Sequence, residues 1–340
     1  MRRCLQLAEQ GDGSVAPNPM VGCVIVQDDK IIGEGFHKSF GKAHAEVNAI
    51  GHVEDKELLK SSTLYVNLEP CAHYGKTPPC ADLIIRSGIP RVVVGCEDPF
   101  DAVAGKGIAK LKENGVEVIL DVLKEECRFL NRRFFTFHEK KRPYLILKWA
   151  QTSDGFIDKI RTGEMGVNWI TGKEVKQLVH LWRSHEQAIL VGTNTVLNDD
   201  PSLTVREVSG RNPIRIIIDR QLKTHMDAKV YDLSARTIVM NEVRDEIVSE
   251  NLQLIKLNDH QDFLPQVLST LYDLNILSVM IEGGAFTLQS FIDIGMWDEA
   301  RMFCGDKTFG EGLKAPDLHR ATPRGEKIGK DSLSVIFNNP

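Results

Sequence analysis

The sequence predicts an α/β protein built from two domains. Short segments rich in β-branched residues alternate with amphipathic segments along the chain, a pattern typical of sheets covered by helices. With 340 residues the chain is long for one core, and two domains of about 150 residues each are expected. A charged segment over residues 139–142 ends at Pro143, so we place the boundary between residues 1–142 and 143–340.

In the first domain, the expected helices and strands follow one another as in an α/β fold. A helix over residues 2–10 ends at Gly11, and Pro17 and Pro19 keep the next loop extended ahead of a strand over 21–26. A turn at 28–30 leads to a partner strand over 31–36, which forms a hairpin. The remaining expected elements are helices over 44–51 and 80–87, one ending at 114 and a long one over 124–138, and strands over 63–67, 91–96 and 116–120.

The second domain continues the alternation. A strand over 144–150 is followed by a helix that begins with the capping-box pattern at residues 171–174 and reaches Arg183. Further strands are expected over 188–192, 214–218, 237–240, 252–257 and 278–282. The last strand runs into Gly283, Gly284 and a helix from about Ala285, an arrangement that binds nucleotide phosphates or serves only as a tight packing turn.

The composition argues against two classes of function. The 47 acidic and 42 basic residues give a net charge of −5, unlike a polynucleotide-binding surface, although small phosphorylated substrates remain compatible with it. No apolar run approaches the length of a membrane span. The seven cysteines are odd in number and scattered among apolar or helical segments, so we expect reduced thiols in a cytoplasmic protein.

The stretch from His44 to Cys80 carries the most specific chemistry. His44, Cys71 and Cys80 offer one imidazole and two thiolates, a set that holds zinc tetrahedrally with the fourth position left to water. Glu46 follows two residues after His44 and is placed to move protons beside the metal. This is the signature of zinc-dependent nucleobase deaminases, except that eight residues instead of two separate the cysteines.

Local structure supports a catalytic rather than a structural metal. His44 and Glu46 fall in the first turn of a helix, where their side chains can converge, and a helix start at Cys80 is expected to lower the pKa of that thiol. A closed structural site would need a fourth protein ligand, for which His37 and His73 are the nearest candidates. Three further side chains are placed to meet a substrate, Asn18 (otherwise a turn residue), His73 and Lys76.

Several of these motifs together resemble one family. They are residues 16–19 (APNP) with Val21 and Gly22, residues 44–46 (HAE), and residues 68–80 (LEPCAHYGKTPPC). The chain resembles the bifunctional riboflavin-biosynthesis deaminase/reductases of the RibD type over essentially its whole length, and in that family the eight-residue gap is the rule. Asp98, Pro99 and residues 103–107 also fit, whereas Phe100 stands where the family often has asparagine.

The resemblance implies both folds and both activities. Residues 1–142 would form a cytidine-deaminase-like three-layer α/β/α domain, and residues 143–340 a dihydrofolate-reductase-like α/β domain. The implied reactions are zinc-dependent hydrolytic deamination of 2,5-diamino-6-ribosylamino-4(3H)-pyrimidinone 5′-phosphate and NADPH-dependent reduction of its ribosyl side chain to ribityl. Zinc and NADPH are the implied cofactors and a dimer through the second domain the implied assembly, with no nucleic-acid or membrane partner.

The resemblance also implies roles in the second domain, residue by residue. The cofactor would contact Ala150, Trp169, Thr195, Asp199, Gly284, Ala285, Phe286, Thr287, Leu288, Gln289 and Ser290. The substrate would contact Arg183, Leu203, Arg206 and Glu282, and the two arginines suit a ribose 5-phosphate because guanidinium forks match phosphate oxygens. Val167 stands where the family usually has a serine that touches substrate, and no residue stands out as the proton donor of the reduction.

Three other interpretations stay open at the level of sequence. A nucleic-acid-editing deaminase shares the zinc set but favours a basic groove and has no use for a reductase-like half. A deaminase with an inactive reductase-like domain would release ammonia without oxidising NADPH. A zinc-stabilised binding protein without catalysis predicts four protein ligands and no ammonia release.

Overall fold

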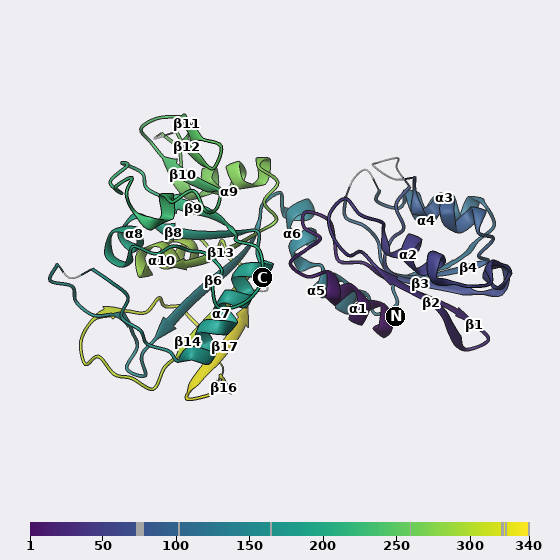
Figure 1. Ribbon diagram of the computed structural model, residues 1–340, viewed down its shortest axis with the longest axis horizontal. Coiled ribbons are helices and arrows are strands. Elements are labelled where there is room, and N and C mark those ends of the chain that lie inside the picture. Colours follow the sequence, from purple (N-terminus) through teal and green to yellow (C-terminus); the bar gives the residue numbers. More distant parts are fainter. Residues whose placement is uncertain are drawn as a thin grey trace. The chain divides into compact units, whose positions relative to one another are not determined.

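The computed structural model divides into two compact units, Met1–Lys141 and Arg142–Pro340, drawn in purple to blue and in teal to yellow in Figure 1. The structure describes residues 1–72, 78–100, 103–163, 165–258, 260–320, 323 and 325–338. Within these ranges, no helix has the length and apolar character needed to cross a membrane.

The first unit is organised around a five-stranded sheet of order β2-β1-β3-β4-β5. Strand β1 runs antiparallel to its neighbours β2 and β3, whereas β3, β4 and β5 run parallel. Asp28 and Asp29 form the β1–β2 turn with positive φ angles of 48° and 58°, as a two-residue hairpin turn requires. The strands are β1 (Gly22–Gln27), β2 (Lys30–Phe36), β3 (Thr63–Leu68), β4 (Arg91–Cys96) and β5 (Glu117–Ile119).

Helices cover both faces of this sheet. Helices α2, α3 and α4 pack on the face that carries Cys23 and Ile25, and α1 packs on the opposite face, against Val24. Both faces of β1 are therefore apolar, and the unit is the expected three-layer α/β/α domain. The helices are α1 (Arg2–Ala8), α2 (Ala45–His52), α3 (Cys80–Arg86), α4 (Lys106–Glu113), α5 (Lys124–Leu130) and α6 (Arg132–Lys140), with short 3-10 turns at Glu9–Gly11 and Lys56–Ser61.

The prediction of a single helix over residues 124–138 is wrong, because two helices occupy this segment. Helices α5 and α6 are separated at Asn131, whose φ of −96° and ψ of 22° interrupt the helical path. The Asn131 amide binds the backbone of Met20, accepting from its N–H at 2.8 Å and donating to its carbonyl at 2.9 Å. A contact 111 residues away in sequence thus sets this break, and local periodicity cannot reveal it.

The second unit contains a ten-stranded sheet of order β11-β12-β10-β9-β8-β13-β6-β14-β17-β16. From β12 to β14 all neighbouring strands are parallel, and β11, β17 and β16 run antiparallel at the two ends. The strands are β6 (Tyr144–Gln151), β8 (Ala188–Gly192), β9 (Ile214–Ile218), β10 (Thr237–Asn241), β11 (Glu246–Ser249), β12 (Leu252–Lys256), β13 (Ser278–Gly283), β14 (Glu299–Cys304), β16 (Glu326–Ile328) and β17 (Asp331–Phe337), with β7 (Phe156–Asp158) and β15 (Leu313–Lys314) paired separately.

Helices again cover both faces. Helices α9 (Phe263–Asp273) and α10 (Ala285–Asp293) pack against the largest apolar cluster, and α8 (Thr193–Asp199) places Val196 in a second cluster with Ile189 and Val191. Helix α7 (Lys173–His185) packs through Val175 and Val179 on Phe303 of β14. The carboxyl ends of the parallel strands meet at one edge, where α/β folds bind their ligands.

The capping box expected at residues 171–174 does not form. The cap residue of α7 is Gly172, and no side chain in this segment accepts a cap hydrogen bond. Instead, the Gly172 N–H donates to Asp331 Oδ2 of β17 at 2.7 Å. A carboxylate from a distant strand therefore replaces the local cap that the pattern predicted.

Candidate active sites

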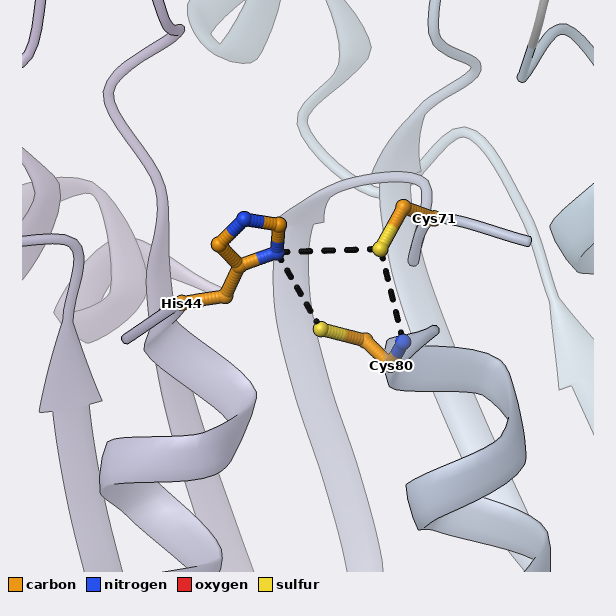
Figure 2. A group of neighbouring side chains, drawn as sticks. All are labelled: His44, Cys71 and Cys80. Atoms are coloured by element: carbon orange, nitrogen blue, oxygen red, sulfur yellow. Dashed lines mark hydrogen bonds between the residues drawn. The ribbon is translucent and has the colours of Figure 1, made fainter. Parts of the chain in front are cut away.

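His44, Cys71 and Cys80 converge in the first unit, as the spacing predicted (Figure 2). His44 Nδ1 lies 3.6 Å from Cys71 Sγ and 3.3 Å from Cys80 Sγ, and the three candidate ligand atoms lie within 4.8 Å of one another. A tetrahedral zinc with ordinary Zn–N and Zn–S bonds separates such atoms by about 3.6 Å. The donor types and their spacing therefore fit a zinc ion.

Two helix starts and one strand end hold the three side chains. His44 is the residue that caps α2, and Cys80 is the first residue of α3. Cys71 follows β3 after Glu69 and Pro70. His44 and Cys80 therefore lie at the starts of helices that pack on the sheet, and Cys71 lies just beyond one of its strands.

Glu69 fixes the segment that carries Cys71. Its buried carboxylate accepts four backbone N–H bonds, with Oε1 bound to Gly107 and Ile108 at 2.9 and 3.1 Å and Oε2 to Asp98 and Gly105 at 3.2 and 3.0 Å. Two of these donors lie in the first turn of α4, where the helix has free N–H groups and favours negative charge. Sequence reasoning missed this role, because Glu69 adjoins the Pro-Cys motif without being a ligand.

Hydrogen bonding separates the acidities of the two thiols. The Cys80 thiol, together with the imidazole of His44 and the Cys80 backbone N–H at 3.4 Å, lowers the pKa of Cys71 to about 4. The pKa of Cys80 is raised, because its thiol donates to Cys71 and is buried. The hydrogen bond between the two thiols therefore favours the thiolate of Cys71, whereas the helix start at Cys80 had predicted a lowered pKa for Cys80.

Glu46 lies beside these ligands in the first turn of α2. Its side chain is only 3% exposed, and burial raises its pKa, with a further increase from the nearby Cys71. The carboxyl group hydrogen-bonds with the Cys80 thiol. A carboxyl group that holds a proton more tightly than usual thus adjoins the candidate zinc ligands, as expected of a proton-transfer residue.

The surrounding residues bear on the structural-zinc alternative. His37 is buried and cannot serve as a fourth ligand, because Nδ1 donates to Ala43 O at 3.1 Å and Nε2 accepts from Asn18 Nδ2 at 3.1 Å. The Asn18 carbonyl oxygen accepts no bond from any described residue. The predicted contacts His73 and Lys76 lie outside the described residues, and Phe100 packs against His138, with their ring centroids 5.0 Å apart.

The second unit contains a cavity of about 1260 Å³ at the carboxyl ends of its parallel strands. Nearly all the residues predicted for this half line it: Ala150, Trp169, Thr195, Asp199, Gly284, Ala285, Phe286, Thr287, Leu288, Ser290, Arg183, Leu203, Arg206 and Glu282. Gln289, predicted to contact the cofactor, does not line the cavity. On helix α10 it faces away from the cavity, and its amide binds Asp293 Oδ1 at 2.7 Å and the backbone of Asp317.

An ion-pair cluster lies in this cavity. Arg183 binds both oxygens of Glu282, and Lys148 Nζ lies 3.7 Å from Glu282 Oε2. Burial alone would raise the pKa of Glu282, but Arg183 and Lys148 outweigh it and lower the pKa to about 2. Burial lowers the pKa of Lys148. The sequence did not single out this residue, because a lone lysine inside an apolar strand belongs to no motif.

His180, which the sequence analysis did not single out, lies with Arg183 and Arg206 in the same cavity. His180 accepts the Arg206 backbone N–H on Nδ1 at 3.0 Å, and burial together with Arg183 and Arg206 lowers its pKa to about 4. His180 is therefore a neutral imidazole with its proton on Nε2 at physiological pH.

The wall that carries Trp169 is held by Arg161. Arg161 donates to Asp158 at 2.7 Å, to Asp199 at 2.6 Å and to the carbonyls of Gly166 and Asn198. Asp199 thus lines the cavity while paired with an arginine. Trp169 is 54% exposed, so it is a cavity-wall residue and not part of the core.

Comparison with known families divides the chain in the same way. The family described as the cytidine and deoxycytidylate deaminase zinc-binding region matches residues 1–96, and the RibD C-terminal domain matches residues 143–322.

Individual relatives match over nearly the whole chain. Riboflavin biosynthesis protein RibD of Aquifex aeolicus is 45% identical over 324 residues, covering 94% of this chain and 89% of that protein. The solved deaminase/reductase of Thermotoga maritima, named for diaminohydroxyphosphoribosylaminopyrimidine and 5-amino-6-(5-phosphoribosylamino)uracil, is 40% identical, with a TM-score of 0.88 and coverage of 99% and 97%. RibD of Acinetobacter baumannii is 33% identical, with a TM-score of 0.89 and the same coverage.

Proposed function

Since this chain belongs to the RibD family of riboflavin-biosynthesis proteins, which join a deaminase domain to a reductase domain, we propose that its two sites act in turn on one phosphorylated pyrimidine. The first reaction is hydrolytic deamination of 2,5-diamino-6-ribosylamino-4(3H)-pyrimidinone 5′-phosphate. The second is reduction of the ribosyl group of the product to ribityl with NADPH. We also propose a cytoplasmic location and a homodimer through the second domain, in line with the family resemblance.

In the deaminase site His44, Cys71 and Cys80 would hold one zinc ion. The chemistry supplied there is the ionisation of a water molecule near neutral pH. The observation that carries this proposal is the spacing of 3.3 and 3.6 Å between the histidine nitrogen and the two sulfurs, beside the buried Glu46. Of the two candidate fourth ligands, His37 is engaged elsewhere and His73 lies outside the described residues, and we propose that the fourth position is left to water.

Glu46 is the proton carrier of this reaction. It takes a proton from the attacking water, delivers it to the pyrimidine ring nitrogen, and then serves the departing ammonia. Its raised pKa suits this task, because the carboxyl group must hold a proton between the two transfers. Asn18, whose carbonyl oxygen accepts no bond within the described part of the chain, would contact the ring edge, and His73 and Lys76 would complete the proposed substrate contacts.

In the reductase site the start of α10 would receive the phosphates of NADPH, and NADPH supplies the hydride. Glycines here let two threonine side chains that line the cavity approach the backbone closely. A Cβ on Gly192 would meet Thr287 Oγ1 at 2.5 Å, and one on Gly283 would meet Thr195 Oγ1 at 3.2 Å. Ala150, Trp169 and Asp199 line the rest of the proposed cofactor path.

Lys148 is the proposed proton donor to the opening ribosyl ring. It is buried in the cavity beside Glu282, and burial lowers the pKa of its ammonium group, which makes that group a stronger proton donor than an ordinary lysine. Arg183, Leu203, Arg206 and Glu282 would hold the substrate.

Zinc-loaded protein incubated with the diaminopyrimidine phosphate, with and without NADPH, tests the proposal. Ammonia is expected in both cases, and NADPH oxidation only after deamination. Ammonia without any cofactor oxidation would leave a deaminase with an inactive second domain. As a metal control, Cys71→Ala should lose the bound zinc whereas Cys304→Ala, a thiol in the other unit, should retain it.

A further inference from the structure

Helix α7 presents three nitrogen-bearing side chains to the cavity of the second unit. Lys176, His180 and Arg183 are spaced four and three residues apart, so they share one face of the helix, and all three line the cavity. The proposed function uses Arg183, whereas Lys176 and His180 have no assigned task.

A neighbouring loop is tied to this face. The Arg206 backbone N–H donates to His180 Nδ1 at 3.0 Å, and Arg206 Nη1 donates to Thr204 Oγ1 at 2.7 Å. Lys176 Nζ lies 2.7 Å from Glu207 Oε1, the residue that follows Arg206. Lys176 and the side chain of Arg206 are therefore anchored to the same short stretch of chain.

The charges of this region favour a dianion. Four cationic side chains face two carboxylates, which leaves two positive charges in excess: Lys148, Lys176, Arg183 and Arg206 against Glu207 and Glu282. His180 adds no charge, because burial and its cationic neighbours lower its pKa and keep it neutral, but it offers its Nε2–H as a donor. A phosphate monoester carries a charge close to −2 at neutral pH, which matches the excess.

The Arg183–Glu282 and Lys176–Glu207 ion pairs differ in how readily the basic side chain can leave its carboxylate for a ligand. The side chains of Arg183 and Glu282 are 13% and 6% exposed and are joined by two hydrogen bonds, so the Arg183 guanidinium remains paired with Glu282. The side chains of Lys176 and Glu207 are 33% and 28% exposed, and exposed pairs of this kind are weak and readily exchanged. Lys176 Nζ also lies over the Trp169 ring, 5.1 Å from the ring centroid, at the wall of the cavity.

We propose that Lys176 is a phosphate-binding residue of the reductase site, which exchanges Glu207 for the 5′-phosphate of the substrate. Arg206 and the Nε2–H of His180 complete the contact. This inference rests on the proposed reduction of a phosphorylated substrate, and it names the side chain that the phosphate recruits.

Steady-state reduction by the full chain, with NADPH saturating and 5-amino-6-(5-phosphoribosylamino)uracil varied, tests the inference. Lys176→Met should raise KM about fivefold to tenfold and leave kcat within about twofold of the parent, because the phosphate is remote from the reacting carbon. Lys173→Met is the matched control, an exposed lysine of the same helix that does not line the cavity, and should leave KM unchanged. Glu207→Gln, which frees Lys176, should lower KM.

Inorganic phosphate gives a readout that needs no turnover. It should raise the Tm of the parent chain and of Lys173→Met, and the rise should shrink in Lys176→Met. If Lys176→Met matches Lys173→Met in both KM and the phosphate response, the inference is overturned while the proposed function stands. If the parent chain oxidises no NADPH, the proposed reduction fails, and the Tm response alone then decides the role of Lys176.

Discussion

Arg183 and Glu282 form a two-pronged ion pair across 99 residues of sequence, with Nε 2.8 Å from Oε1 and Nη2 2.7 Å from Oε2. The family resemblance predicts that both residues contact the substrate. Because the arginine fork is already bound to Glu282, we expect Arg183 to act on a substrate phosphate mainly through its charge and its remaining Nη1 group, which donates to Thr204 O at 3.3 Å. The pair also ties helix α7 to strand β13, so it has consequences for stability.

The first prediction concerns acid stability. The pKa of Glu282 is about 2 in the folded chain against an ordinary 4.5, so its stabilising contribution is complete above about pH 5 and is lost as pH falls towards 2. The shift corresponds to about 3 kcal/mol at neutral pH. Denaturant unfolding followed by a probe in the second unit should show this loss. In Glu282→Gln the unfolding free energy should be lower at pH 7 and should vary less with pH between 5 and 2, and equal pH dependence in the two chains would contradict the assignment.

The second prediction separates the two sites. Glu46→Gln should retain bound zinc but lose ammonia release by at least about a hundredfold, because an amide cannot accept and return the proton. Reduction of the deaminated intermediate should survive, since that reaction uses the other unit. Zinc content, ammonia and NADPH oxidation are the three measurements. Equal loss of both activities would count against independent sites.

A third prediction concerns Glu69. Glu69→Gln keeps the shape of the side chain but replaces one acceptor oxygen by a donor, so two of the four backbone N–H groups lose their partner. We expect zinc affinity to fall about tenfold to a hundredfold, because Cys71 follows two residues later. Competition with a chromogenic chelator measures this. Glu113→Gln, an exposed carboxylate at the far end of α4, should behave as the parent chain.

The fourth prediction tests proton donation by Lys148. Lys148→Met should lower kcat of the reduction about a hundredfold with NADPH binding unchanged, and Lys148→Arg should not restore it, because a guanidinium holds its proton at neutral pH. In the parent chain kcat should decline as pH rises through the pKa of Lys148, which burial places below that of an ordinary lysine. Rescue by arginine would show that only the positive charge matters.

The cluster of candidate zinc ligands could be predicted from sequence, because short motifs contain these residues and Glu46. His44, Cys71 and Cys80 lie within 37 residues, and their residue types and neighbouring prolines specify a metal site before any fold is known. The alternation of strands and helices was equally readable, since burial on one face imposes a period along the chain.

Contacts between distant segments decided the rest. The break at Asn131 depends on Met20, the start of α7 on Asp331, and the orientation of Gln289 on Asp317. No local pattern encodes such pairs.

The arrangement of charged groups in the cavity of the second unit also depends on contacts between distant segments. Lys148, Arg183 and Glu282 come from strand β6, helix α7 and strand β13, and only the strand order brings them together. Their pKa values follow from burial and from one another's charge, which are properties of the folded chain. The sequence by itself therefore determined which reactive groups are present and which of them form the candidate zinc site, and the tertiary structure decided which of those groups are paired or buried.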